Sequence, residues 1–112
     1  MKRFCLALDL KNDPVLIGEY KRYHEKIWPE ITDHIYRAGV IDMEIYNIGD
    51  RLFMIMETED DFTFERMEAL AANNKNVAEW ESIMWKFQKP LVGTKSGEKW
   101  KLMERIFKLE KP

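Results

Sequence analysis

The fold is decided by one stretch of the chain, residues 40–58, which reads VIDMEIYNIGDRLFMIMET. Two extended apolar runs make up most of it, residues 40–48 and residues 52–58, and runs of this length and composition are typical of strands. The three residues between them, Gly49-Asp50-Arg51, form a connection short and turn-prone enough to reverse the chain. The stretch therefore predicts a β-hairpin, and the segments on either side determine what covers it.

An alternating pattern near the N-terminus predicts another strand. Apolar side chains occupy every second position there, at Phe4, Leu6, Leu8 and Leu10. A period of two places them on one face of a strand. Asn12-Asp13-Pro14 then supplies a capping side chain and a proline at the first helical turn, where its missing N–H costs nothing. We therefore expect the strand to be followed directly by a helix.

The expected helix runs from Pro14 toward Gly39 and carries one apolar stripe. Pro29 interrupts this stripe and disfavours helical geometry at Trp28, so a kink or a restart is expected there. Gly39 ends the segment as a C-cap. The stripe recurs at steps of three and four residues and should face the sheet; its members are Leu16, Tyr20, Tyr23, His24, Ile27, Ile31 and Ile35.

Helical spacing returns after the hairpin, between Asp61 and Gln88. A polar break at residues 73–76 divides this segment and predicts two short helices. A loop that reaches Gly97 follows, and residues 99–109 then predict a fourth strand. The side chains that share one face of that strand are Met103, Arg105, Phe107 and Leu109.

The expected order of elements is β-α-β-β-α-β, the split βαβ arrangement of ferredoxin-like α+β folds. In this arrangement helices cover one face of a four-stranded antiparallel sheet, and the other face stays bare. Such a bare patch is too apolar for open water, so we expect the chain, a single domain over residues 1–112, to form a homodimer. The large apolar residues of that face would come from among Ile41, Met43, Ile45, Phe53 and Ile55.

The composition of the chain excludes several classes of protein. Apolar residues make up 46% of the 112 residues, enough for a compact globule, while 34% charged residues argue against a membrane protein. Lys and Arg number 18 against 20 Asp and Glu, spread along the chain, so nothing indicates nucleic acid binding. The lone Cys5 cannot form an internal disulfide, and the N-terminus lacks a signal-peptide cleavage site. We therefore expect a cytoplasmic protein with neither a membrane nor a nucleic-acid partner.

Few side chains could carry proton chemistry near neutral pH, because the chain has only two histidines, His24 and His34. They lie ten residues apart, without a Cys-x-x-Cys or His-x-x-x-His pair, so no metal site is expected. No serine or threonine lies in a nucleophile-elbow setting, and no glycine-rich loop could cradle a phosphate. We expect neither covalent catalysis nor a cofactor.

Tyr20 and His24 are the pair that suggests a site. They lie four residues apart on the inward stripe, so their polar ends should approach one another. Ordinary core packing explains such a pair more often than catalysis does. The four tryptophans are equally open, since an indole either fills the core or stacks on the apolar face of a sugar ring. The surrounding charged residues look like a solvated helix face and receive no role: Lys21, Arg22, Glu25, Lys26 and Glu30.

Residues 19–30, EYKRYHEKIWPE, resemble the signature of the L-rhamnose mutarotase family, in which a Tyr, a His and a Trp-Pro-Glu occur at these spacings. The resemblance covers nearly the whole chain, including both strands of the hairpin, the helix around Trp80 and residues 102–107. It implies a sugar substrate and a dimeric α/β barrel built from ferredoxin-like protomers. It also implies that His24 is the proton donor and that Tyr20 binds the sugar.

Two features depart from the rhamnose enzymes of this family. Those enzymes carry two adjacent tryptophans in the later helix, whereas here Trp80 is followed by Glu81. The fuller tail at residues 95–104 is similar to relatives assigned to L-fucose mutarotation. Exchanging an indole for a carboxylate replaces stacking by a hydrogen-bond acceptor, which suits a different pattern of hydroxyls. L-rhamnose and L-fucose, both 6-deoxy-L-hexoses, are therefore the two candidate substrates.

Mutarotation opens a pyranose to its aldehyde and recloses it on the other face. One group must protonate the ring oxygen while another takes the anomeric proton, and each such group contributes about 10²- to 10⁴-fold. We expect His24 to act as the acid and return as the base on reclosure, with Tyr20 orienting or relaying. The remaining site residues suggested by the resemblance are Trp28 and Trp80 as walls of the sugar site and Glu81 and Glu104 as contacts to hydroxyls.

Two other functions stay open. Dimeric α/β barrels also host small monooxygenases that act on quinols or haem with little cofactor machinery, an argument from the fold alone. Oxygen uptake with a quinol, or a haem absorbance shift, would reveal that activity. A noncatalytic module would instead bind the sugar without changing the rate of anomer exchange.

Overall fold

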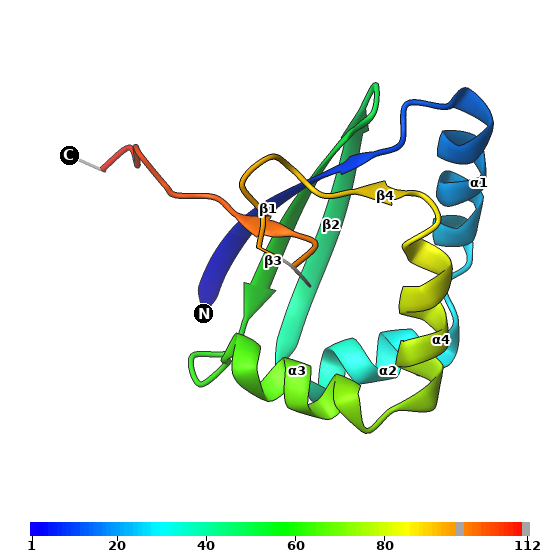
Figure 1. The fold of residues 1–112 in the computed structure, drawn as a ribbon. Helices are drawn as coiled ribbons and strands as arrows, with labels where there is room; N and C mark the ends of the chain where they lie inside the picture. Colours follow the sequence, from blue (N-terminus) through cyan, green and yellow to red (C-terminus); the bar gives the residue numbers. More distant parts are fainter. Residues whose placement is uncertain (96–97, 111–112) are drawn as a thin grey trace.

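The centre of the fold is an antiparallel sheet with the strand order β2-β3-β1-β4, in which β5 also pairs with β1 (Figure 1). The computed structural model describes residues 1–95 and 98–110, so the end of the predicted loop at Gly97 lies outside the described residues. The long strands are β1 (Lys2–Leu10), β2 (Val40–Ile48) and β3 (Arg51–Thr58). β2 and β3 pair with each other, and β1 pairs with β3. The predicted hairpin and first strand are confirmed.

The long helix predicted before the hairpin is divided in two. α1 (Pro14–Glu25) begins as expected, because the Asp13 carboxylate accepts hydrogen bonds from two backbone N–H groups of the first turn, at 2.9 and 3.4 Å. α2 (Pro29–Arg37) starts with a proline at its first position. Between the helices, Trp28 has an extended ψ of 135°, since the proline ring disfavours a helical conformation of the residue before it. Gly39, just beyond α2, takes a φ of 98°, the left-handed conformation that glycine allows.

Two short helices follow the hairpin, as predicted: α3 (Phe64–Ala72) and α4 (Lys75–Met84). Thr63 caps α3 and Asn74 caps α4, each through a side-chain oxygen that accepts a backbone N–H. The polar break between the helices is thus the cap of the second one. In the part of the chain that the structure describes, no helix is long and apolar enough to cross a membrane.

One face of the sheet is buried under the helices. Tyr20 of α1, Ile31 of α2 and Trp80 of α4 form one core cluster with Leu10 and Leu52 of the strands. α3 packs against a second cluster, farther along the same face. The buried side chains that the long strands contribute to this face are Leu6, Leu8, Leu10, Val40, Leu52, Met54, Met56 and Thr58.

Among the residues that the structure describes, no helix covers the opposite face of the sheet. The strand register pairs Cys5 with Ile55 and Ala7 with Phe53, and all four alternate with the buried residues of their strands. Their side chains therefore point away from the helices. Phe53 and Ile55 thus lie on the bare face, as expected.

The three other residues considered for the bare face lie differently. Met43 and Ile45 pair with buried methionines of β3, so both lie on the face that the helices cover. Ile41, which is exposed, lies at the register shift between Val40 and Asp42, where the pairing of β2 with β3 is irregular. A bulge of this kind changes the alternation of side chains, which a uniform period of two does not foresee.

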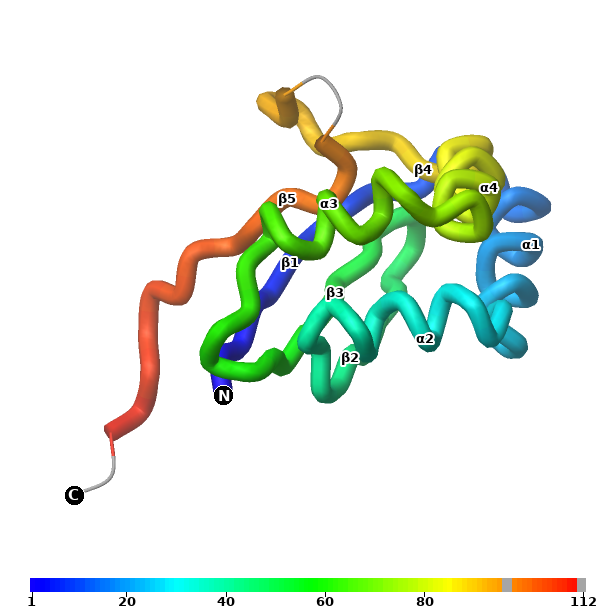
Figure 2. Tube along the Cα trace, turned by 90° about the horizontal axis from the view of Figure 1, so that it is seen from below, coloured from blue at the N-terminus to red at the C-terminus, as the bar shows by residue number. Residues whose placement is uncertain are grey.

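The fourth strand predicted over residues 99–109 is present only near its start, as β5 (Lys101–Leu102), and the extent predicted for it is wrong. β5 lies beside the middle of β1, and another short strand, β4 (Gln88–Lys89), lies beside the end of β1 at the same edge. Beyond β5 the chain leaves the sheet (Figures 1 and 2), and Ile106 and Phe107 are 91% and 74% exposed. An alternating pattern selects one face of an extended segment, but the segment becomes a strand only where another strand bonds to it. Met103 still donates its backbone N–H to the Cys5 oxygen at 2.7 Å, whereas the described residues 104–110 pair with no strand.

Candidate active site

Helix α1 brings Tyr20 and His24 together at one end of the sheet. Their ring centroids are 4.4 Å apart, and the ring planes are inclined by 35°. The His24 Nδ1 lies 2.8 Å from the backbone oxygen of Tyr20, one helical turn earlier. A carbonyl oxygen can only accept a hydrogen bond, so Nδ1 carries a proton and donates it. This bond leaves Nε2 as the ring nitrogen that is available to accept or deliver a proton.

Burial sets the protonation state of both residues. Burial lowers the pKa of His24 below its usual 6.5, and the hydrogen bond to the Tyr20 carbonyl offsets part of that shift. Burial raises the pKa of the Tyr20 hydroxyl to about 12, a shift that the Gln88 side chain reduces and the Glu81 carboxylate increases. At neutral pH, His24 is therefore a neutral base and Tyr20 a protonated hydrogen-bond donor.

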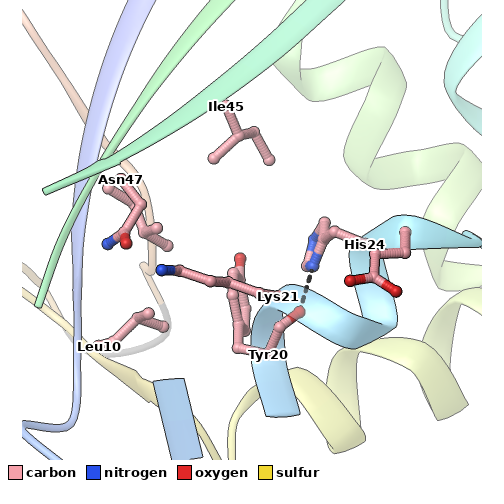
Figure 3. A pocket seen from close by; sticks show the side chains of 8 residues that line it. Leu10, Tyr20, Lys21, His24, Ile45 and Asn47 are labelled. Carbon is pink, nitrogen blue, oxygen red and sulfur yellow. Dashed lines mark hydrogen bonds between the residues drawn. The ribbon is translucent and has the colours of Figure 1, made fainter. Parts of the chain in front are cut away.

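A cavity of about 190 Å³ lies beside this pair, between α1 and the ends of the three long strands (Figure 3). It is smaller than the roughly 300–1,000 Å³ typical of sites for drug-sized ligands, so it suits a small molecule. The strands supply an apolar side, formed by Leu10, Ile45 and Leu52. Polar groups come from α1 and from Asn47 of β2. Such a lining fits a small ligand that carries both hydroxyls and apolar carbon.

Across residues 1–95 and 98–110, no three His, Cys, Asp or Glu side chains are gathered in a way that could hold a metal ion. The chemistry that the cavity residues themselves support is proton transfer, through the His24 Nε2 and the Tyr20 hydroxyl.

Comparison with known proteins identifies the family. The sequence model of a family described as L-rhamnose mutarotase matches residues 3–109. The chain belongs to the L-rhamnose mutarotase family. An L-fucose mutarotase of Xanthomonas campestris is 40% identical to it over 111 residues, covering 97% of this chain and 89% of that protein. Membership of the family confirms the predicted enzyme class, a sugar mutarotase and hence an isomerase acting on carbohydrates.

Solved structures show the same fold at low sequence identity. The crystal structure of an L-rhamnose mutarotase from Formosa agariphila superposes with a TM-score of 0.72 at 20% identity, covering 98% of this chain and 100% of that one. A dimeric ferredoxin-like protein from an uncultured marine organism gives a TM-score of 0.53 at 14% identity, covering 96% and 91%. These likenesses confirm the predicted ferredoxin-like α+β fold.

The two tryptophans that the family resemblance assigns to the site pack next to His24, one against its ring and the other against the first tryptophan. The ring of Trp80, buried on α4, meets His24 edge-on with centroids 5.7 Å apart. Trp28 meets Trp80 in the same manner at 5.1 Å. The structure thus brings Tyr20, His24, Trp28 and Trp80 into one aromatic cluster. Neither tryptophan lines the cavity, so their stacking against a sugar stays a prediction.

The two carboxylates that the resemblance suggests as sugar contacts lie outside the cavity. Glu81 of α4 forms an ion pair with Lys99, whose ammonium stands 4.7 Å from the centre of the Trp85 ring. This ion pair links the segment before β5 to α4. Glu104 is exposed and belongs to the segment beyond β5, a segment that runs away from α1 in Figure 1. Neither carboxylate lines the cavity of a single chain, and their contacts with sugar stay predictions.

Sequence reasoning missed three polar residues that line the cavity. Lys21 and Glu25 are exposed, as their assignment to a solvated helix face predicts, but both also border the cavity. Asn47 pairs with the buried Leu52 and so lies on the face that the helices cover. The sequence of the hairpin could have indicated Asn47. A period of two places this polar residue on the same face of the strand as the apolar Ile45, the face that the helices cover. No local pattern reveals the other two, since the cavity depends on how far α1 stands from the hairpin.

Proposed function

We propose that this mutarotase interconverts the α and β anomers of a 6-deoxy-L-hexose by acid–base catalysis at His24, with L-fucose as the first candidate and L-rhamnose as the second. The observation that carries the proposal is the free Nε2 of His24 at a small cavity, oriented by the hydrogen bond from Nδ1 to the Tyr20 carbonyl. The order of the sugars is supported by the likeness to the L-fucose mutarotase over nearly the whole chain. Glu81 in place of a second tryptophan supports the same order.

The protonation states of His24 and Tyr20 indicate which proton each residue transfers. Because burial lowers the pKa of His24, its neutral Nε2 first takes the proton of the anomeric hydroxyl. The C1–ring oxygen bond breaks as the C1=O bond forms, and the Tyr20 hydroxyl supplies a proton to the ring oxygen. After rotation about C1–C2, reclosure reverses both transfers, and His24 returns its proton to O1. In this order His24 acts first as a base, whereas the sequence led us to expect it to act first as an acid.

We also propose that the enzyme is a homodimer packed through the bare face of the sheet. Phe53 and Ile55 project from that face, and the C-terminal segment exposes Ile106, Phe107 and Leu109. Fully burying one such side chain contributes roughly 1.5–3 kcal/mol, so covering several of them favours association. The solved neighbour described as a dimeric ferredoxin-like protein supports this arrangement.

We also propose that the protein is a cytoplasmic enzyme that acts on a soluble sugar. Cys5 is a free thiol, which suits a reducing compartment. The net charge of -2, with 18 Lys and Arg against 20 Asp and Glu spread along the sequence, does not favour a nucleic-acid partner.

Saturation transfer between the anomeric NMR signals tests the proposed function. Wild-type protein should speed anomer exchange of L-fucose, and to a smaller extent that of L-rhamnose, above the rate in buffer alone. A sugar-binding module would shift or broaden sugar signals without speeding exchange. A monooxygenase would consume oxygen with a quinol. Exchange at the buffer rate with both sugars contradicts the proposal.

A further inference from the structure

The cavity has a second polar end, away from the His24 ring. Lys21, next to Tyr20 on α1, sends its side chain across the cavity toward Asn47 of β2 (Figure 3). The ammonium of Lys21 and the amide of Asn47 point toward one another there, with Leu10 on the same side (Figure 3). The acid–base chemistry described above uses neither group.

The hairpin turn holds the Asn47 amide in one orientation. Its Nδ2 donates to the backbone oxygen of Gly49 at 3.0 Å and to that of Arg51 at 3.1 Å. Both partners are carbonyl oxygens, which only accept, so the amide cannot be turned round without losing both bonds. Oδ1 is therefore the atom that Asn47 offers to a ligand. Within residues 1–95 and 98–110, no hydrogen bond reaches this oxygen.

Lys21 supplies the complementary group. An ammonium donates hydrogen bonds and cannot accept them. Among the residues that the structure describes, no ion pair engages the Lys21 side chain. The far end of the cavity thus presents one fixed acceptor and one free donor.

A neutral hydroxyl is the group that satisfies both at once, because it donates one hydrogen bond and accepts another. A ligand carboxylate would bind Lys21, but the lone pairs of the Asn47 Oδ1 would repel it. A ligand ammonium could bind Oδ1, but the positive charge of Lys21 would repel it. The pair therefore selects an uncharged, hydroxylated part of the ligand. In a pyranose whose C1 and ring oxygen face His24 and Tyr20, the carbon across the ring from C1 is C4.

We propose that Lys21 and Asn47 together hold the C4 hydroxyl of the sugar and thereby decide which C4 epimer the enzyme accepts. This assignment rests on the proposed function, since it uses the placement of C1 at His24. It bears on the choice between the two candidate sugars, because L-fucose and L-rhamnose differ in configuration at C2 and C4. The C4 hydroxyl of L-fucose is axial, and that of L-rhamnose is equatorial.

Two pairs of sugars isolate C4 from C2. L-fucose and 6-deoxy-L-glucose differ only at C4, whereas 6-deoxy-L-glucose and L-rhamnose differ only at C2. The experiment measures kcat/KM for anomer exchange of all three sugars by NMR, with the wild type, Lys21→Met and Asn47→Ala. Lys26→Met is the matched control, because Lys26 follows the end of the same helix and does not line this cavity.

The wild type should prefer one C4 epimer, and both cavity variants should reduce that preference roughly 10-fold or more, the effect of losing a hydrogen bond to a charged or fixed polar group. Their ratio for the C2 epimers should stay at the wild-type value, and Lys26→Met should change neither ratio. If Asn47→Ala weakens the hairpin by removing the bonds of its Nδ2, Lys21→Met still decides the matter, because its side chain makes no ion pair in the described chain.

An active wild type with no C4 preference, or a C4 ratio that Lys21→Met leaves unchanged, overturns the assignment and leaves the proposed function standing. A wild type that speeds no exchange overturns the proposed function and, with it, the assignment.

Discussion

The Nδ1 of His24 lies 2.8 Å from the backbone oxygen of Tyr20, so one residue orients the ring of the other. Tyr20 lies one turn before the end of α1, and its carbonyl oxygen carries the partial negative charge of the peptide dipole. That charge stabilises the imidazolium that forms when Nε2 takes a proton. Tyr20 thus contributes through two groups, its backbone carbonyl behind the histidine and its hydroxyl at the cavity.

Replacing Tyr20 by Phe separates these two contributions. The Tyr20→Phe variant keeps the backbone carbonyl and the ring, which packs against Phe87 with centroids 6.0 Å apart, and removes only the hydroxyl. We expect anomer exchange to slow by roughly 10²-fold, the contribution of one general acid. NMR saturation transfer measures the rate, and near-ultraviolet circular dichroism checks the packing. Exchange at the wild-type rate would return Tyr20 to a packing role.

The pH dependence of the rate follows from the state of Nε2. The neutral imidazole is the active form, and burial lowers the pKa of His24 below 6.5. The rate should therefore be constant above about pH 6.5 and fall as the pH drops through the lowered pKa. Because the pKa of Tyr20 is about 12, no alkaline loss is expected near pH 9. Rates in buffer alone are subtracted at each pH, and a rate that rises toward acid would contradict the role of His24 as first base.

The proposed dimer is tested by a charge on the bare face of the sheet. Phe53→Asp should convert a particle with the mass of two chains into one of 13.5 kDa, because the carboxylate would be buried in the interface without a partner. Size-exclusion chromatography with light scattering measures the mass. Tyr36→Asp is the control, an exposed aromatic of α2 that lies outside the strands of that face. A wild type that elutes as one chain would contradict the dimer.

The ion pair between Glu81 and Lys99 should act on stability. The Lys99 side chain is 12% exposed and that of Glu81 is 47% exposed, so water only partly screens the pair. We expect Glu81→Gln and Lys99→Met to couple by about 1 kcal/mol in the free energy of unfolding. Urea denaturation of both single variants and the double variant measures the coupling. If Glu81→Gln alone changes the preference between sugars, Glu81 has the hydroxyl contact that the family resemblance suggests.

Local patterns were enough to predict most of the fold. The alternation of β1 and the two runs of the hairpin predicted strands because their faces differ in burial. Pro29 predicted the division between α1 and α2, because its effect on Trp28 is purely local. The extent of the C-terminal strand was wrong for the opposite reason. How far that strand runs depends on how long it stays beside β1, which is a tertiary relation, and β5 ends at Leu102 although the alternation continues to Leu109.

The candidate site was predictable only in part. The spacing of Tyr20 and His24 predicted their contact, because one helical turn separates them. Lys21 and Asn47 come together only because α1 stands beside the turn of the hairpin, a tertiary relation that no stretch of sequence expresses. Residues on one helix turn can therefore be paired from sequence, whereas residues on opposite walls of a cavity cannot.

The central claim, that the Nε2 of His24 transfers the anomeric proton, is tested most directly by His24→Asn. The amide nitrogen of Asn can still donate to the Tyr20 carbonyl, as Nδ1 does, but the variant has no base at the position of Nε2. We expect saturation transfer with L-fucose to show a loss of roughly 10²-fold or more in the accelerated exchange, with circular dichroism unchanged. Exchange by His24→Asn at the wild-type rate would contradict the account.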